Sequence, residues 1–246
     1  MPPYPEVGLR ELADEIIACK LCPRLVSFRE SVPARTAFKS EKYWRKPLPG
    51  FGDPQARLML IGLAPAAHGG NRTGRLFTGD ESARFLMTAL HRVGLANQPT
   101  SLGRDDGLRL RGCYISAAVR CVPPANRPTP EEFINCSGYL DRELQLLTNL
   151  RAVVALGQLA FKAYLDIARK RERIPKGTKF AHGTHVKLEG LPWLYGCYHP
   201  SPRNTYTGKL TEAMLVRVLE NARAEQLGRR PAPGAKPSGG RVSIRA

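Results

Sequence analysis

The sequence predicts an α/β fold in which helices cover both faces of a mostly parallel sheet. Four short apolar segments have the length of buried strands, and helical segments lie between them. Strands that alternate with helices in this way form parallel sheets covered by helices. Three of these strands run directly into loops that carry unusual motifs. In a parallel sheet such loops meet at the carboxyl edge, where ligands usually bind.

The first half of the chain contains two of the predicted strands. Residues 6–18 form an amphipathic helix, and residues 57–62 (RLMLIG) form a buried strand. A helix follows at residues 81–93, with Asp80 placed to be its N-cap. Residues 113–119 (CYISAAV) form the second strand.

The second half repeats the alternation. Thr129, followed by Pro130 and two glutamates, is typical of a helix start. The pattern predicts a helix at 130–147, a strand at 151–156, a helix from Gly157 to about residue 170, a strand at 191–198 and a helix at 209–227. We expect one folded domain over residues 1–227. Residues 228–246 are a basic tail that we expect to be disordered, because they lack the apolar residues needed to offset the entropy of ordering.

The charge of the chain points to a polyanionic partner. The formal net charge is +17 and the pI is near 10.1, and the excess persists when the tail is left out. A basic surface of this size favours nucleic acid. No apolar run approaches the roughly 20 residues that span a bilayer, so we expect a cytoplasmic protein without a membrane segment. Cysteines in that compartment stay reduced.

Four cysteines form a candidate metal site. Cys19 and Cys22 have the two-residue gap that lets two thiolates bind one centre, and Cys121 and Cys136 bracket a Pro-rich loop. Thiolates suit zinc or an iron–sulfur cluster. Only the first gap is short, which favours a cluster over a zinc finger. Zinc and four unrelated buried cysteines remain as alternatives. The two other cysteines fall inside predicted strands and are expected in the core.

The loop after the first strand, GLAPAAHGGNRTGRLFTGD, is rich in glycine. Such loops commonly bind phosphate, yet this one fits neither GxxxxGK[ST] nor GxGxxG. Phe77 lies in this polar loop, where its ring can stack on a base or belong to the core. Asp80 ends the loop and can act there or cap the helix.

The motif HPSPRN at residues 199–204 follows the fourth strand. Its two prolines stiffen the loop. Ser201 and the backbone amides can hold a phosphate, and Arg203 can enter a groove or stack. His199 can donate a hydrogen bond to an oxygen that gains negative charge.

Together these signatures resemble the uracil-DNA glycosylase superfamily, and within it the iron–sulfur enzymes of family 5 (type B). The Gly-rich loop resembles motif one, HPSPRN resembles motif two, and the four cysteines fall on the cluster ligands. The resemblance runs from Cys19 to about the final helix. It implies a three-layer α/β/α sandwich with a central, mostly parallel four-stranded sheet, and a catalytic domain over residues 1–227.

Two departures from the best-known members concern the base pocket. Those members carry an Asp in motif one to position water, where this chain has Ala64 two residues after Gly62. They carry an Asn at the end of the second strand, where this chain has Ala117. Family 5 shares both features and accepts a broader set of damaged bases. A small pocket with few polar contacts has fewer means to reject a wrong base.

The resemblance implies a DNA repair enzyme that hydrolyses the N-glycosidic bond of uracil and leaves an abasic site. Hypoxanthine and ethenocytosine are further expected substrates, and each nucleotide must flip out of the duplex. The resemblance implies that His199 stabilises the leaving base, and that Asp80 and Asn126 place the attacking water. It implies that Phe77 stacks on the base. Ser201, Arg203 and Asn204 are the implied DNA contacts, and Arg203 fills the gap that the flipped base leaves in the stack.

The resemblance also implies a structural 4Fe-4S cluster, a monomer, and a nucleoid-associated protein of bacterial or archaeal type. One alternative is a narrower family 4 enzyme, which would carry Glu-Ala-Pro-Gly where this chain has Leu63-Ala64-Pro65-Ala66. Another is a DNA-binding protein without catalysis, held together by a cluster or by zinc.

Overall fold

The sheet has the expected parallel centre. The computed structural model describes residues 5–226. Its sheet has the order β1-β3-β2-β4-β6-β5, and the strands are β1 (Phe51–Gly52), β2 (Leu58–Gly62), β3 (Cys113–Ala117), β4 (Ala152–Leu156), β5 (His185–Val186) and β6 (Trp193–Cys197). The four central strands, β3, β2, β4 and β6, are the predicted ones and are parallel.

Two short strands extend this centre to six. β1 pairs antiparallel with β3, and β5 pairs antiparallel with β6, so each closes one edge of the sheet. Each contains two residues. A segment of that length has no periodicity of its own, which is why the sequence predicted four strands.

The longer helices lie where the pattern places them, within about three residues. They are α1 (Pro5–Ala18), α4 (Glu81–Arg92), α5 (Pro130–Leu146), α6 (Gln158–Ala168) and α8 (Glu212–Gln226). Three shorter helices were not predicted from the sequence: α2 (Pro23–Ser31), α3 (Gly70–Thr73) and α7 (Pro202–Tyr206). α2 and α7 each begin at a proline, whose fixed φ suits the first helical position. The tail expected at 228–246 lies outside the described residues.

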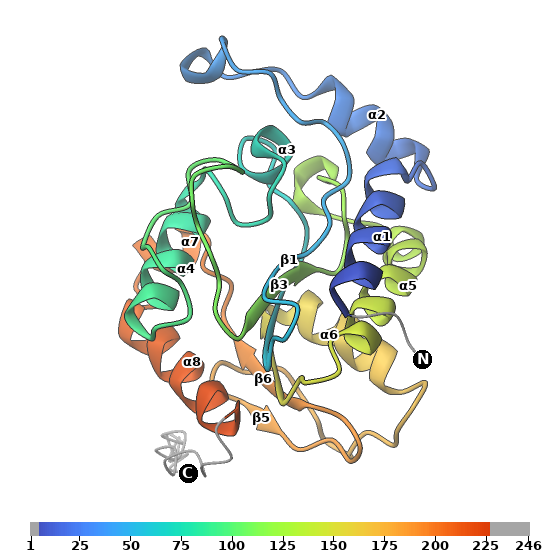
Figure 1. The fold of residues 1–246 in the computed structure, drawn as a ribbon, viewed down its shortest axis with the longest axis vertical. Coiled ribbons are helices and arrows are strands. Elements are labelled where there is room, and N and C mark those ends of the chain that lie inside the picture. Colours follow the sequence, from blue (N-terminus) through green and yellow to red (C-terminus); the bar gives the residue numbers. More distant parts are fainter. Residues whose placement is uncertain (1–4, 227–246) are drawn as a thin grey trace, which may run out of the picture.

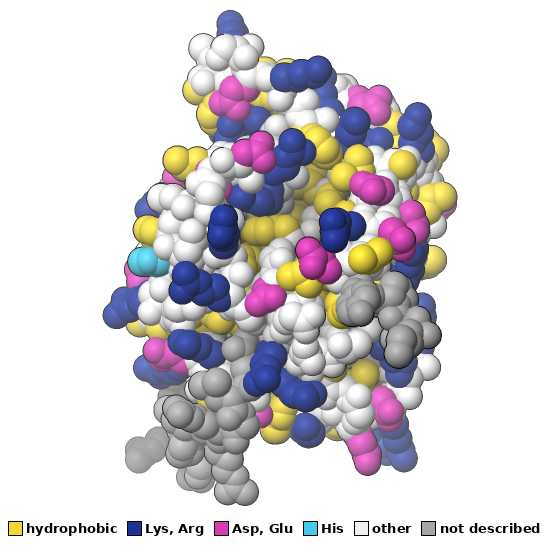
Figure 2. Space-filling model, in the orientation of Figure 1, with side chains coloured by type: hydrophobic (Ala, Val, Ile, Leu, Met, Phe, Trp, Pro, Cys, Tyr) yellow, Lys and Arg dark blue, Asp and Glu magenta, His cyan; other side chains and the backbone are white. Residues whose placement is uncertain are grey.

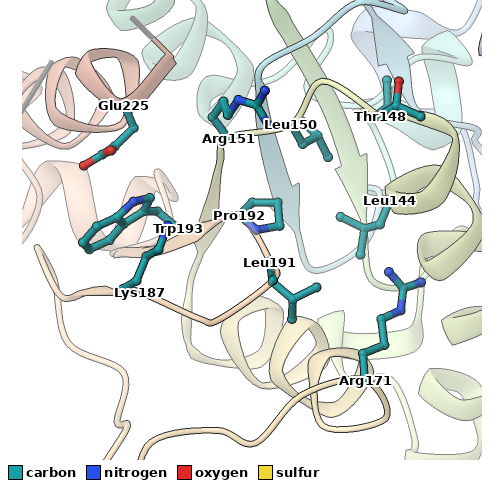
Figure 3. A pocket seen from close by; sticks show the side chains of 12 residues that line it. Leu144, Thr148, Leu150, Arg151, Arg171, Lys187, Leu191, Pro192, Trp193 and Glu225 are labelled. Carbon is teal, nitrogen blue, oxygen red and sulfur yellow. The ribbon is translucent and has the colours of Figure 1, made fainter. Parts of the chain in front are cut away.

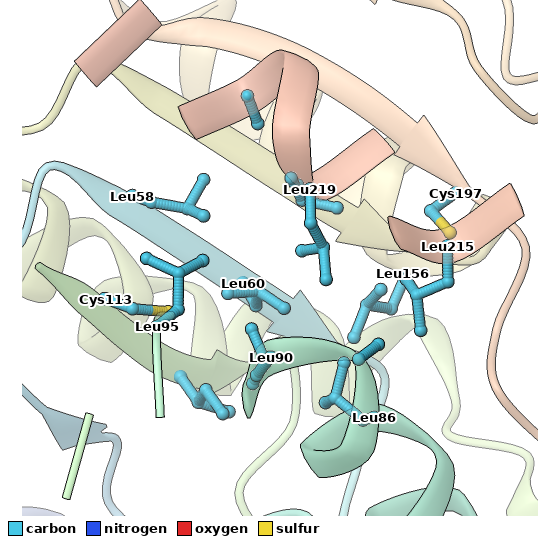
Figure 4. Packing of buried hydrophobic residues seen from close by; sticks show 14 of the residues in the cluster. Leu58, Leu60, Leu86, Leu90, Leu95, Cys113, Leu156, Cys197, Leu215 and Leu219 are labelled. Atoms are coloured by element: carbon cyan, nitrogen blue, oxygen red, sulfur yellow. The ribbon is translucent and has the colours of Figure 1, made fainter. Parts of the chain in front are cut away.

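Two hydrophobic layers cover the sheet. Along β2, Leu58 and Leu60 face one layer while Met59 and Ile61 face the other, as expected for the alternation of side chains along a strand. The first layer packs against α4 and α8 (Figures 1 and 4), and the second against α1, α5 and α6. The fold is therefore the expected three-layer α/β/α sandwich.

The two remaining cysteines, Cys113 and Cys197, belong to the first hydrophobic layer and are fully buried. Their predicted place in the core is confirmed. Within residues 5–226, none of the helices has both the length and the apolar character that crossing a membrane requires.

A buried ion pair joins β3, α5 and the segment before β1. Both guanidinium ends of Arg120 donate to the carboxylate of Glu143, at 3.0 and 2.7 Å, and each side chain is only 1% exposed. Glu143 also accepts hydrogen bonds from the Ser116 hydroxyl and the Gly50 amide. The Leu48 amide donates to the carbonyl of Arg120. This network fixes the chain just before Cys121.

We expect Arg120→Met to lower the free energy of unfolding by about 3–5 kcal/mol, because the carboxylate of Glu143 would remain buried without its charged partner. Urea titration measures the change. Arg142→Met is the matched control, because Arg142 pairs with Glu15 on the surface and such pairs contribute about 0–1 kcal/mol. Equal losses in the two variants would contradict the prediction.

Candidate active site

A cavity of about 540 Å³ lies at the carboxyl edge of the sheet. Its walls come from the loops after β2, β3 and β6, as the topology predicts, with additions from the start of α4 and from the segment before β1. The lining residues are Arg35, Leu63, Ala64, Ala66, Ala67, His68, Gly69, Asp80, Glu81, Ser82, Asn126, His199, Ser201 and Pro202. Figure 2 shows a hollow with hydrophobic walls near α3, bordered by Lys and Arg side chains.

The end of the Gly-rich loop is built from unusual backbone. Phe77 has a φ of 46°, in the left-handed region that bulky residues rarely adopt. A β-carbon on Gly62 would lie 2.8 Å from the ring of Phe77, so glycine at the end of β2 makes room for that ring. The ring centroids of Phe77 and His199 are 6.1 Å apart. Strain of this kind concentrates at functional sites.

Asp80 both caps α4 and lines the cavity. Its Oδ1 accepts a hydrogen bond from the Ala83 amide at 2.8 Å and caps α4. Its Oδ2 lies so close to Gly69 that a β-carbon there would approach within 1.9 Å. Burial raises the pKa of this carboxyl, opposed by backbone hydrogen bonds from Ala83 and Ser82. The predicted cap is confirmed, and the same side chain lines the cavity.

His199 is held by its own loop. The amide of Ser201 and the side-chain amide of Asn204 both donate to the His199 carbonyl, each at 2.8 Å. Burial lowers the pKa of the imidazole to about 4. The ring is therefore neutral near pH 7 and carries one N–H donor and one acceptor.

Asn126 reaches the cavity from the Pro-rich loop. It is exposed, and both it and Ala125 have positive φ, 55° and 51°. Asparagine tolerates the left-handed region, but alanine seldom adopts it. Two such residues in succession turn the loop toward the cavity. No glycine marks this turn, so it could not be predicted from the sequence.

The structure brings five of the predicted residues into one cavity: Ala64, Asp80, Asn126, His199 and Ser201. Among the described residues, Gly62, Phe77 and Ala117 are not in its lining; Ala117 pairs in register with Gly62 in the sheet and is 1% exposed. Arg203 is exposed on α7. Asn204 turns its side-chain amide to the His199 carbonyl. The functions assigned to all these residues stay predictions.

Sequence reasoning missed four polar residues of the cavity, namely Arg35, His68, Glu81 and Ser82. The position of His68 in the middle of the Gly-rich loop is a signal that could have identified it. No such signal marks Arg35, because it lies far from every motif and only the folded chain brings it to the cavity.

The four cysteines of the candidate metal site gather at one end of α5. Cys121 and Cys136 pack with Cys22, Leu25 and Val119, and Cys19 lies near enough to Cys22 and Cys121 to raise the pKa of both thiols, although burial is the larger cause. None of the four is in a disulfide. Within the described residues, no three side chains of the usual ligand types converge as they would around a single metal ion.

Nitrogen donors surround these sulfur atoms. Arg29 Nη1 lies 3.1 Å from Cys121 Sγ, and Asn135 Nδ2 lies 3.5 Å from Cys22 Sγ. Arg24 clamps α2 to the start of α5 through both carboxylate oxygens of Glu132, at 2.8 and 3.0 Å. The segments that carry the cysteines are therefore fixed to one another through side chains as well as by packing.

A second hollow, of about 460 Å³, lies at the opposite edge of the sheet (Figure 3). Arg151, which precedes β4, and Trp193, which begins β6, place it at the amino ends of these strands. None of its lining residues belongs to the motif loops. It is therefore separate from the candidate active site.

Comparison with known proteins agrees with the fold. The family model of the Uracil DNA glycosylase superfamily matches residues 49–223. This chain belongs to that superfamily. It is 51% identical over 209 residues to a type-5 uracil-DNA glycosylase of Thermus thermophilus, covering 85% of this chain and 94% of the relative.

A second type-5 relative, from Pyrobaculum aerophilum, is 48% identical, with 87% of this chain and 92% of the relative covered. A type-4 uracil-DNA glycosylase of Sulfurisphaera tokodaii is more distant, at 28% identity over 87% of this chain and 85% of the relative. These identities place the chain with the type-5 members, as motif one indicated.

The depressed pKa of His199 predicts how stability depends on pH. The unfolded chain binds a proton at this residue near pH 6.5, whereas the folded chain does so only near pH 4. Stability contributed by the neutral ring is therefore present above about pH 6.5 and is lost as the pH falls toward 4. Urea titrations of wild type and His199→Asn should diverge in this window, with wild type losing more. Parallel curves would contradict the assignment.

Proposed function

We propose that this protein is a monofunctional uracil-DNA glycosylase that cleaves the N-glycosidic bond of uracil in DNA and leaves an abasic site. One observation carries the proposal: a neutral His199 from motif two and the partly buried carboxylate of Asp80 from motif one line a single cavity. We include hypoxanthine and ethenocytosine among the substrates. The apolar wall of Leu63, Ala64, Ala66 and Ala67 supports this breadth, because it offers few directional contacts that could reject a base.

The chemistry follows from the groups in the cavity. Cleavage leaves negative charge on the departing base and positive charge on the sugar. His199 donates its N–H to a base oxygen. The imidazole is neutral and remains so while it donates this hydrogen bond. Asp80, negatively charged and partly desolvated, stabilises the cationic sugar and, with Asn126, orients the attacking water.

The surroundings of the cavity suit a flipped nucleotide. Phe77, supported by Gly62, presents a ring beside His199 for stacking, and Gly62 and Ala117 keep the base end of the sheet free of bulk. Ser201 lines the cavity. Arg203 is exposed on α7, where its side chain can fill the gap that the flipped base leaves in the DNA base stack. Asn204 acts through the His199 carbonyl that it holds. We also propose that the protein acts as a monomer on nucleoid DNA in the cytoplasm.

Incubation with DNA duplexes that contain uracil, hypoxanthine or ethenocytosine, followed by alkaline cleavage of abasic sites, tests the function. We expect strand cleavage at uracil that depends on the enzyme. Binding without any abasic site would support the DNA-binding protein without catalysis. Cleavage at uracil alone would support the narrower family 4 activity.

His199→Ala and Asp80→Asn separate catalysis from folding. We expect each to lower the single-turnover rate on uracil by about 10²–10³-fold, the typical loss for a preorganised electrostatic group. Asparagine is as good an N-cap as aspartate, so Asp80→Asn should melt within a few degrees of wild type. Full activity in that variant would show that Asp80 is only a cap.

We also propose that Cys19, Cys22, Cys121 and Cys136 hold a structural 4Fe-4S cluster. Two observations support this proposal: the four thiols are free and lie at the same end of the fold, and two of their sulfur atoms accept N–H donors, a feature that tunes such clusters. A cluster would crosslink the segments that carry the four cysteines. The positive charge of its iron ions would keep the thiolates ionised. The effect of the cluster on catalysis would be indirect, through the segment 122–135, which carries Asn126 and the start of α5.

The visible spectrum distinguishes the cluster from zinc, which has a filled d shell and no such absorbance. We expect a brown protein whose colour is lost in Cys136→Ala. Cys197→Ala is the matched control and should retain the colour, because this buried cysteine lies in the core under α8. A colourless protein that contains one equivalent of zinc would overturn the cluster.

A further inference from the structure

His68 is a polar residue of the cavity, and neither motif implied a function for it. It stands in the loop after β2, between Ala67 and Gly69, and lines the cavity together with His199. These two histidines come from loops after β2 and β6, which β4 separates in the sheet. They therefore reach the cavity from two different sides of its entrance.

A buried tyrosine holds the imidazole of His68 from behind. Tyr43 Oη lies 3.0 Å from His68 Nδ1, and the two rings meet edge to face with centroids 6.1 Å apart. Tyr43 is 5% exposed and packs with Val32 and Val122. Such a partner fixes the orientation of the ring before any ligand arrives.

The same contact favours one tautomer. The backbone amide of Arg35 donates to Tyr43 Oη at 3.4 Å, so the phenol oxygen already accepts one hydrogen bond, which favours donation of its own proton to Nδ1. A neutral imidazole that accepts at Nδ1 carries its proton on Nε2. Burial, with help from Arg35 and Arg72, lowers the pKa of His68 and keeps the ring neutral. Nε2 is then a fixed N–H donor.

We propose that this Nε2–H of His68 reads the oxygen that deamination leaves on a base, O4 of uracil and O6 of hypoxanthine. The inference rests on the proposed function. Cytosine and adenine carry an amino group at the same position, and two donors facing each other cannot form a hydrogen bond. A site built to pair with a substrate group discriminates strongly against an analogue that lacks it. One donor therefore distinguishes uracil from cytosine and hypoxanthine from adenine, in a pocket whose other walls are largely apolar.

Pairing a variant of the enzyme with a variant of the substrate tests the contact. Single-turnover rates are measured for wild type and His68→Ala on duplexes that contain uracil or pyrimidin-2-one, which has hydrogen in place of O4. If the contact exists, His68→Ala slows uracil excision about tenfold, the value of one hydrogen bond of about 1.4 kcal/mol, and changes pyrimidin-2-one excision less than about threefold.

Equal slowing of both substrates would overturn the proposal. His185→Ala is the matched control, since it removes an exposed imidazole on β5 and should leave both rates unchanged. A wild-type protein that leaves uracil in place would overturn the proposed function as well. Active wild type with an equally active His68→Ala variant would overturn only the assignment of His68.

The tautomer has its own readout, independent of activity. In ¹⁵N spectra of histidine-labelled protein, assigned by loss of the signal in His68→Ala, we expect an unprotonated Nδ1 and a protonated Nε2. Tyr43→Phe should give a mixture of tautomers and slow uracil excision about threefold, part of the value of the hydrogen bond. A protonated Nδ1 in wild type, or an unchanged spectrum in Tyr43→Phe, would overturn the positioning function of Tyr43.

Discussion

The buried pair of Arg120 and Glu143 connects the parts of this molecule that must act together. Its charges are withdrawn from water, so they are favourable only while both partners and their added hydrogen bonds stay in place. Arg120 stands one residue before Cys121, and Glu143 lies on α5, the helix that carries Cys136. The pair thus aligns the cysteine end of the fold with the carboxyl edge of the sheet, where Ser116 of β3 joins the same carboxylate.

The site itself depends on small residues that permit close approach. Gly62 leaves room for the ring of Phe77, and Gly69 leaves room for the carboxylate of Asp80. Ala64 and Ala117 stand where the resemblance to better-known members implies polar anchors for water and base. In our proposal the polar functions belong to His199, Asp80 and His68, each of which is oriented by a hydrogen bond or by its loop within the protein. A pocket that accepts several bases can therefore still hold its polar groups in defined positions.

The sequence predicted the central sheet, the five longer helices and the convergence of three loops, because these depend on periodicity and on the rules of parallel sheets. It predicted Asp80 and Thr129 as caps, since capping is a local interaction, and both caps form. It could not predict the edge strands, which are too short for a pattern, or the left-handed turn at Ala125 and Asn126. Arg35 and the pairing of Tyr43 with His68 depend on contacts between distant segments, and no local signal reports them.

The cap formed by Asp80 decides when the Asp80 side chain loses its conformational entropy. A carboxylate that must be ordered when substrate arrives loses rotamer freedom at that moment and weakens binding. Asp80 is already ordered by the amide of Ala83, so that loss belongs to folding. The direction of the carboxylate is then set by the register of α4 against the sheet. Leu86 and Leu90, on the face of α4 that is buried in the core, therefore help to set the direction of the Asp80 carboxylate.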